Sequence, residues 1–230
     1  MPKDAARKTE PPAEFREMGM AHATFRREFG LLPALVRGVP PGDDERREIV
    51  ARHIELVVLT LVKHVHGSDA SLRPRLLDRV PDEKKDDLRA TAAHDTYMRA
   101  LTADLLAAVG EWRLRSAAGE RVAVAADRLD AGVGAYATAQ EESLLPLVEE
   151  YITVAEWAEI VQQEVAGTPP DDVALLFGMM MYEAGPGVID GMIRDMPPDV
   201  QSVLKQVAAK AFATHARLVH GTATPPRGRA

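Results

Sequence analysis

The sequence predicts an all-α protein: an up-down-up-down four-helix bundle followed by additional short C-terminal helices. Of its 230 residues, 46% are hydrophobic but only 5% are aromatic, and abundant Ala, Leu, Glu and Arg favour helices over strands. Four segments repeat apolar residues at helical spacing, and their connectors are short enough for antiparallel neighbours. We expect a disordered tail at 1–13, the bundle at 14–152, a C-terminal extension packed on it at 153–221, and a disordered tail at 222–230.

The composition argues against several kinds of partner. A formal net charge of -7 and a pI near 5.5, with no segment rich in Lys and Arg, predict that nucleic acid is not bound. The chain has no cysteine, so disulfides and thiolate metal sites are excluded. We find neither the apolar run of a signal peptide nor about 18 consecutive apolar residues. We therefore expect a cytoplasmic protein without a membrane partner.

The first two predicted helices each carry a histidine in their apolar stripe. The first helix, ending near Arg37, has a stripe formed by Phe15, Met18, His22, Phe25, Phe29 and Leu32. The second is capped by Asp43 or Asp44 and runs to about Gly67. Its stripe of Ile54, Val57 and Leu61 continues into His64 and Ser68. His53, three turns before His64 on nearly the same face, is expected to point inward too.

The third and fourth helices continue this pattern. The third is expected from about Pro81 to Arg115, and its stripe begins with His94 and Met98. The fourth ends near Tyr151 and carries Tyr136 and Gln140 among apolar residues. Polar side chains on four facing helices predict one internal site, because buried imidazoles need partners and such clusters hold metals in bundles.

An internal similarity relates the ends of the second and fourth helices. His64 precedes Pro74 by ten residues, and Tyr136 precedes Pro146 by ten. We therefore expect the polar positions of these two helices to face each other.

From Thr153 onward the sequence is divided into shorter helical segments. Thr153 and Glu156 form the sequence pattern of a capping box, and Pro and Gly pairs then divide the remainder into three further short helices. The apolar character of these helices makes a homodimer plausible.

Several segments resemble those of the bacterial hemerythrin-like proteins, the HHE cation-binding family, including actinobacterial members with a C-terminal extension. They are MGMAHATFRREF, LVKHVHGSDASLRPRLLDR, AAHDTYMRALTADLL, AQEESLLPLVEEYITVAEW and LLFGMMMYEA. The resemblance extends from about residue 15 to residue 221. It implies a four-helix bundle with a non-haem di-iron centre, held by five histidines and two carboxylates, that binds or reacts with O₂, peroxide or nitric oxide.

The resemblance also implies a ligand set, and this chain departs from it. His22, His64, His94 and Glu141 match ligand positions of the family. Ser68 replaces the bridging glutamate, whereas Met98 and Tyr136 replace two histidines. Because two adjacent metal ions need anionic charge between them, a di-iron centre is disfavoured. The four matching residues favour one non-haem ion of iron, manganese or zinc.

Three functions remain open at this point. In the first, His22, His64, His94 and Glu141 bind one metal ion that reacts with O₂ or peroxide. In the second, no metal is bound, and the polar cavity binds or transforms a small organic molecule; His64 or His94 would be the acid or base and Tyr136 the donor. In the third, the protein acts through its surface as a regulatory or dimeric scaffold. The residues expected to line the cavity are Ser68, Met98, Tyr136, Gln140 and His53.

Overall fold

The computed structural model describes residues 16–184, 186–193 and 197–228, and they contain helices but no β-strand. The all-α class is thereby confirmed, whereas the predicted tail at 1–13 lies outside the described residues. The long helices are α2 (Arg16–Arg37), α3 (Asp44–Gly67), α5 (Asp82–Leu114) and α6 (Gly119–Ala139). Short helices α4 (Arg73–Leu77) and α7 (Leu145–Tyr151) extend α3 and α6.

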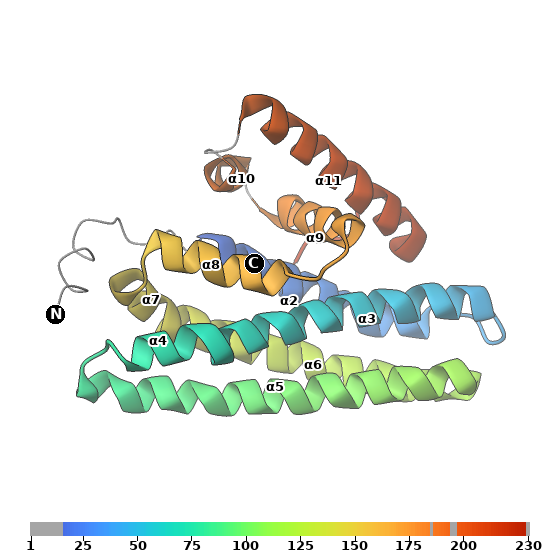
Figure 1. Ribbon diagram of the computed structural model, residues 1–230. Helices are drawn as coiled ribbons and strands as arrows, with labels where there is room; N and C mark the ends of the chain where they lie inside the picture. Colours follow the sequence, from blue (N-terminus) through green and yellow to red (C-terminus); the bar gives the residue numbers. More distant parts are fainter. Residues whose placement is uncertain (1–15, 185, 194–196, 229–230) are drawn as a thin grey trace.

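The long helices pack together as a helical bundle. Figure 1 shows α2, α3 with α4, α5, and α6 with α7 lying side by side and alternating in direction. Their shared core contains fully buried side chains from α2, α3, α5 and α6, among them Phe29, Leu32, Ile54, Leu61, Leu105 and Leu129. Asp43 accepts a hydrogen bond from the backbone N–H of Arg46 and caps α3, one of the two positions that the sequence predicts.

Two π-helical turns interrupt the bundle at equivalent positions. Ser68–Leu72 joins α3 to α4, and Gln140–Leu144 joins α6 to α7. Each is followed closely by a proline, Pro74 or Pro146, which lacks an N–H and crowds the carbonyl four residues before it. The helix widens there, so that Arg73 N bonds Ser68 O and Leu145 N bonds Gln140 O. Turns of this kind frequently mark functional sites.

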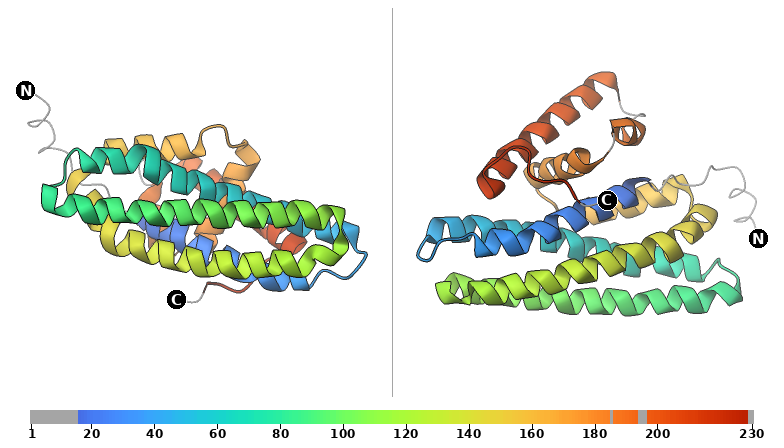
Figure 2. Two further views of the ribbon diagram at one scale, coloured as in Figure 1. Left: turned by 90° about the horizontal axis from the view of Figure 1, so that it is seen from below. Right: turned by 180° about the vertical axis from the view of Figure 1, so that it is seen from behind.

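The C-terminal helices cover one side of the bundle. They are α8 (Val154–Val165), α9 (Pro170–Glu183), α10 (Pro186–Met192) and α11 (Pro198–His220). The predicted capping box of α8 is confirmed, with Thr153 and Glu156 in reciprocal hydrogen bonds. Figure 2 shows α9 to α11 stacked on the side of α2 and α3, opposite α5 and α6.

Helix α11 is longer than the short helix expected, with 23 residues. It packs closely on α9 because Gly178 has no side chain there: a Cβ atom would lie 2.2 Å from the Ala208 carbonyl oxygen. The expected homodimer stays a prediction. Helix α11 exposes three large apolar side chains, Val200, Val203 and Val207.

The disordered tail expected after α11 stays a prediction, and within this segment Pro225 and Arg227 lie against α9. Tyr182 donates a hydrogen bond to the Pro225 carbonyl (2.7 Å), and the Arg227 guanidinium lies 5.1 Å from the Tyr182 ring centre. These contacts with a partly buried tyrosine are invisible in the proline-rich local sequence. Throughout the described ranges, every helix is too short or too polar to traverse a bilayer.

Candidate functional site

Three aromatic side chains from three helices meet inside the bundle. The ring of His22 on α2 lies 5.4 Å from that of His64 on α3 and 6.2 Å from that of Tyr136 on α6. The His64 and Tyr136 rings are also 6.2 Å apart, which confirms that the similar ends of the second and fourth helices face each other. All three side chains are buried.

Glu141 fixes the orientation of His22. Its Oε1 lies 2.9 Å from His22 Nδ1, and Arg26 donates two hydrogen bonds to the same carboxylate at 2.9 and 3.0 Å. Partial burial alone would raise the pKa of Glu141, but the bonds from Arg26 and His22 outweigh it and lower that pKa. A carboxylate accepts hydrogen bonds, so His22 carries its proton on Nδ1 and presents the lone pair of Nε2 to the interior.

Burial keeps His22 neutral. Desolvation, together with the neighbouring His64, lowers its pKa from 6.5 to about 3 in spite of Glu141. At neutral pH the side chain is therefore a hydrogen-bond acceptor at Nε2. Burial likewise raises the pKa of Tyr136, with a further contribution from Asp95, so its hydroxyl stays protonated and available as a donor.

Four buried polar atoms at this level have no hydrogen-bond partner among the described residues: His22 Nε2, Ser68 Oγ, Tyr136 OH and Gln140 Oε1. Ser68 is near enough to Tyr136 to oppose the rise in its pKa, but the two do not form a hydrogen bond of normal geometry. An unpaired buried polar atom typically costs about 1–3 kcal/mol. Several together, drawn from α2, α6 and both π-turns, indicate a place for water or a ligand.

His94 does not join this group, contrary to the position expected for it. It is exposed on α5, whereas the next residue, Asp95, is fully buried. The guanidinium of Arg73, at the end of the first π-turn, pairs with Asp95 and fixes the rotation of α5. The same rotation buries Met98, which packs in the apolar core. Of the four expected metal ligands, three lie together and one lies outside.

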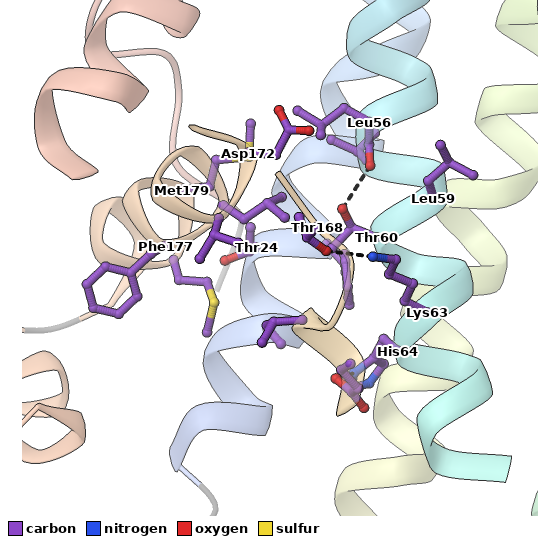
Figure 3. Close-up of a pocket in the computed structure, with 18 of the residues that line it drawn as sticks. Thr24, Leu56, Leu59, Thr60, Lys63, His64, Thr168, Asp172, Phe177 and Met179 are labelled. Atoms are coloured by element: carbon purple, nitrogen blue, oxygen red, sulfur yellow. Dashed lines mark hydrogen bonds and ion pairs between the residues drawn. The ribbon is translucent and has the colours of Figure 1, made fainter. Parts of the chain in front are cut away.

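An apolar cavity of about 380 Å³ reaches one of the three rings, that of His64, and lies between α2 and α3 on one side and α8 and α9 on the other (Figure 3). Apolar side chains dominate its lining, including Met18, Phe25, Trp157, Val161, Leu176 and Met179. His64 belongs both to the cavity wall and to the ring cluster, and its Nδ1 lies 3.7 Å from Glu164. Gly67 allows this approach, because a Cβ atom there would lie 2.3 Å from the Glu164 carboxylate.

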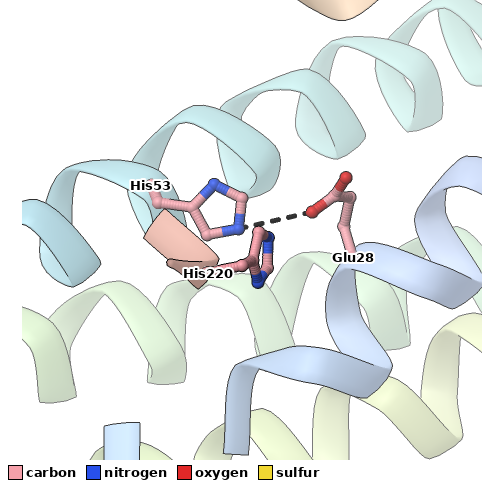
Figure 4. Close-up of side chains that lie close together, drawn as sticks. All are labelled: Glu28, His53 and His220. Carbon is pink, nitrogen blue, oxygen red and sulfur yellow. Dashed lines mark ion pairs between the residues drawn. The ribbon is translucent and has the colours of Figure 1, made fainter. Parts of the chain in front are cut away.

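His53 does not line this cavity, although the sequence predicts that it points inward. It is buried about 16 Å further along α3 from His64, at 1.5 Å per residue, and belongs to a second polar group. Glu28 on α2, His53 and His220 at the end of α11 could hold a metal ion, since one ligand atom of each lies within 4.8 Å of the others (Figure 4).

Glu28 and His220 are site residues that no sequence pattern indicates. A glutamate next to Arg27 in a charged stretch is typical of a solvated helix face, yet Glu28 is buried. His220 stands five residues after His215 near the end of the chain, and nothing in the local sequence connects it with α2 or α3. Burial lowers the pKa of both His215 and His220 to about 4, so both are neutral at pH 7.

No match to this chain is found among known family models, characterised proteins or solved structures. The likeness to the hemerythrin-like family is therefore carried by the quoted segments alone, and no family is identified.

Proposed function

We propose that this protein binds a small, predominantly apolar organic molecule, with its apolar body in the 380 Å³ cavity and its polar group at the His22, His64 and Tyr136 cluster. The observation that carries the proposal is the position of His64, which belongs to the cavity wall and also contacts two rings with unpaired polar atoms. Pockets of about 300–1,000 Å³ with apolar walls and few polar groups are typical of small-molecule sites.

The donors around the cluster favour an organic ligand over the single reactive metal ion that the resemblance implies. Glu141 is already neutralised by Arg26 and bound by His22, and His94 is exposed elsewhere. Within the described part of the chain, the three His and Glu side chains that are spaced closely enough to bind one metal ion are Glu28, His53 and His220, which lie outside this cavity. A metal reacting with O₂ or peroxide here is thus less well supported.

The cluster suits a ligand group that both donates and accepts hydrogen bonds, such as a hydroxyl. His22 Nε2 would accept its proton, and the Tyr136 hydroxyl would donate to its oxygen. A general base works best when its pKa lies near the ambient pH, and the pKa of His22 is about 3. We therefore propose that His22 binds the ligand and does not transfer a proton.

The test uses 1-anilinonaphthalene-8-sulfonate as a fluorescent probe of the cavity. Thr60→Phe should fill the space beside Lys63 and His64 and weaken probe binding at least tenfold. Thr96→Phe is the matched control, because both threonines bond the carbonyl four residues before them and Thr96 is exposed on α5. Circular dichroism checks that both variants fold.

The polar end of the site is tested with 1-octanol. It should displace the probe, and Tyr136→Phe should weaken 1-octanol several-fold while leaving the affinity of the probe unchanged. Equal probe affinity in the Thr60 and Thr96 variants, or no displacement by 1-octanol, would contradict the proposal.

A further inference from the structure

The second polar group has the spacing of a metal site. His53 Nε2 lies 3.4 Å from Glu28 Oε2, and two ligands at 2.0–2.1 Å from a tetrahedral zinc ion lie roughly 3.3–3.4 Å apart. His220 brings a third ligand atom within 4.8 Å of these two. We propose that Glu28, His53 and His220 bind one divalent transition-metal ion of the zinc class, which ties α11 to α2 and α3.

His53 Nε2 and Glu28 Oε2 face each other without a hydrogen bond. His53 and Glu28 are both 1% exposed, and neither His53 Nε2 nor Glu28 Oε2 makes a hydrogen bond within the described part of the chain. Figure 4 shows His53 and Glu28 directed toward each other, with the His220 ring beside the line that joins them. The two atoms form only a long ion pair at 3.4 Å, and a cation between the three residues would bind both of them directly.

The neighbouring residues orient the ligands as in known metal sites. His53 Nδ1 lies 3.0 Å from His215 Nε2, so a proton on Nδ1 leaves Nε2 free to bind the ion. The other oxygen of Glu28 accepts from Arg27, which directs Oε2 toward His53. Metal-binding histidines almost always use their second nitrogen in this way, and carboxylate ligands are in turn hydrogen-bonded.

The local charge also favours a divalent cation. Arg27 carries one positive charge, and two buried carboxylates, Glu28 and Glu183, pair with it. These three side chains together carry a net charge of -1, and the Arg27 guanidinium also lies 5.1 and 5.0 Å from the ring centres of Tyr182 and Phe212. A second cation near His220 is Arg46, whose guanidinium donates hydrogen bonds to the Leu218 and Val219 carbonyls.

The ligand types restrict the ion. Two imidazole nitrogens and one carboxylate oxygen suit zinc and related borderline ions better than magnesium or calcium, which take oxygen ligands. Three protein ligands leave a fourth tetrahedral position for water. His220 also lines a small hollow of about 210 Å³ with Arg46 and Leu31, so one of the three ligands borders the surface.

The experiment measures Zn²⁺ binding to untagged, chelator-treated protein by calorimetry. One Zn²⁺ per chain is expected, and His220→Ala and Glu28→Gln should each weaken binding at least tenfold. His220 is half-buried at a helix end, so its replacement leaves the core intact. His94→Ala, which removes an exposed histidine of α5, is the matched control and should bind as the wild type does. Co²⁺ should bind the wild type with the intense visible absorption of a tetrahedral site.

Added Zn²⁺ should also raise the thermal midpoint of the wild type but not of His220→Ala, because an ion that binds only the folded chain stabilises it. Absence of Zn²⁺ binding would overturn the proposal and leave a His–Glu ion pair. Equal loss of binding in His94→Ala would assign the ion to surface histidines. Thr60→Phe, which fills the apolar cavity, should leave Zn²⁺ affinity unchanged, so the two sites are tested separately.

Discussion

His22 and Glu141, 119 residues apart in the chain, meet through Nδ1 and Oε1 at 2.9 Å. The pair fixes the tautomer of a histidine that burial keeps neutral. The imidazole is therefore a permanent acceptor inside the bundle at physiological pH, and this state depends on the folded chain, because the unfolded chain hydrates the ring and restores its ordinary basicity.

The neutral state of His22 predicts a loss of stability in mild acid. Its pKa is about 3 when folded and 6.5 when unfolded, so its contribution is complete above pH 6.5 and declines as the pH falls, since only the unfolded chain takes up the proton. His22→Gln should reduce the loss of unfolding free energy between pH 7.0 and 5.5 by about 1 kcal/mol. Urea titrations at both pH values, with chelator present, measure this difference.

His66, which is exposed on α3 two residues after His64, provides the control. His66→Gln should follow the wild type at both pH values. If His22→Gln and the wild type lose the same free energy in acid, the folded protein protonates His22 and the proposed acceptor is lost.

The unpaired hydroxyl of Tyr136 predicts an unusual result of its removal. Tyr136→Phe should leave the free energy of unfolding unchanged or raise it by up to about 1 kcal/mol, because a buried hydroxyl without a partner already costs energy. Tyr182→Phe makes the same change where the hydroxyl bonds Pro225 and should cost about 1 kcal/mol. Urea titrations measure both variants. If Tyr136→Phe destabilises the protein more than Tyr182→Phe does, the Tyr136 hydroxyl has a strong hydrogen-bond partner.

The sequence was sufficient where local chemistry decides the structure. The ends of the long helices follow from caps and prolines, and the equal distances from His64 to Pro74 and from Tyr136 to Pro146 predict two facing rings. The π-turns begin four residues after each of these rings, at Ser68 and Gln140. Proline chemistry explains both turns, although the spacing alone did not reveal them.

The rotation of α5 could not be predicted in this way. Stepping back from Met98 by three residues gives Asp95 and by four gives His94, and both steps are helical. The choice depends on Arg73, a residue of another helix that pairs with Asp95. The grouping of Glu28, His53 and His220 could not be predicted from local patterns for the same reason. His220 lies beside the other two only because α9 and α11 pack on the bundle.

Two adjacent alanine substitutions test this rotation. Asp95→Ala should cost about 3–5 kcal/mol, because it removes the buried carboxylate that pairs with the buried Arg73 and leaves only the partly exposed Asp69, 3.6 Å away. His94→Ala, on the exposed face, should change stability by no more than about 0.5 kcal/mol. Chemical denaturation measures both, and a large effect of His94→Ala would indicate that this residue is buried, as the apolar stripe of the sequence predicts.

The attachment of α11 to the bundle gives the last prediction. Gly178→Ala should destabilise the protein by about 1–3 kcal/mol, because the new Cβ would lie 2.2 Å from the Ala208 carbonyl oxygen and the two helices would have to separate. The same change at Gly134 of α6, where nothing lies within 4 Å, should stabilise by about 0.5–1 kcal/mol through helix propensity alone. Thermal and chemical denaturation measure both changes, and stability changes of opposite sign in the two variants would identify Gly178 as a packing residue.

The same two variants test the link between the α9–α11 contact and the metal ion. Since α11 carries His220, Gly178→Ala should weaken Zn²⁺ binding, whereas Gly134→Ala should not. Equal Zn²⁺ affinity in the two variants would contradict this link.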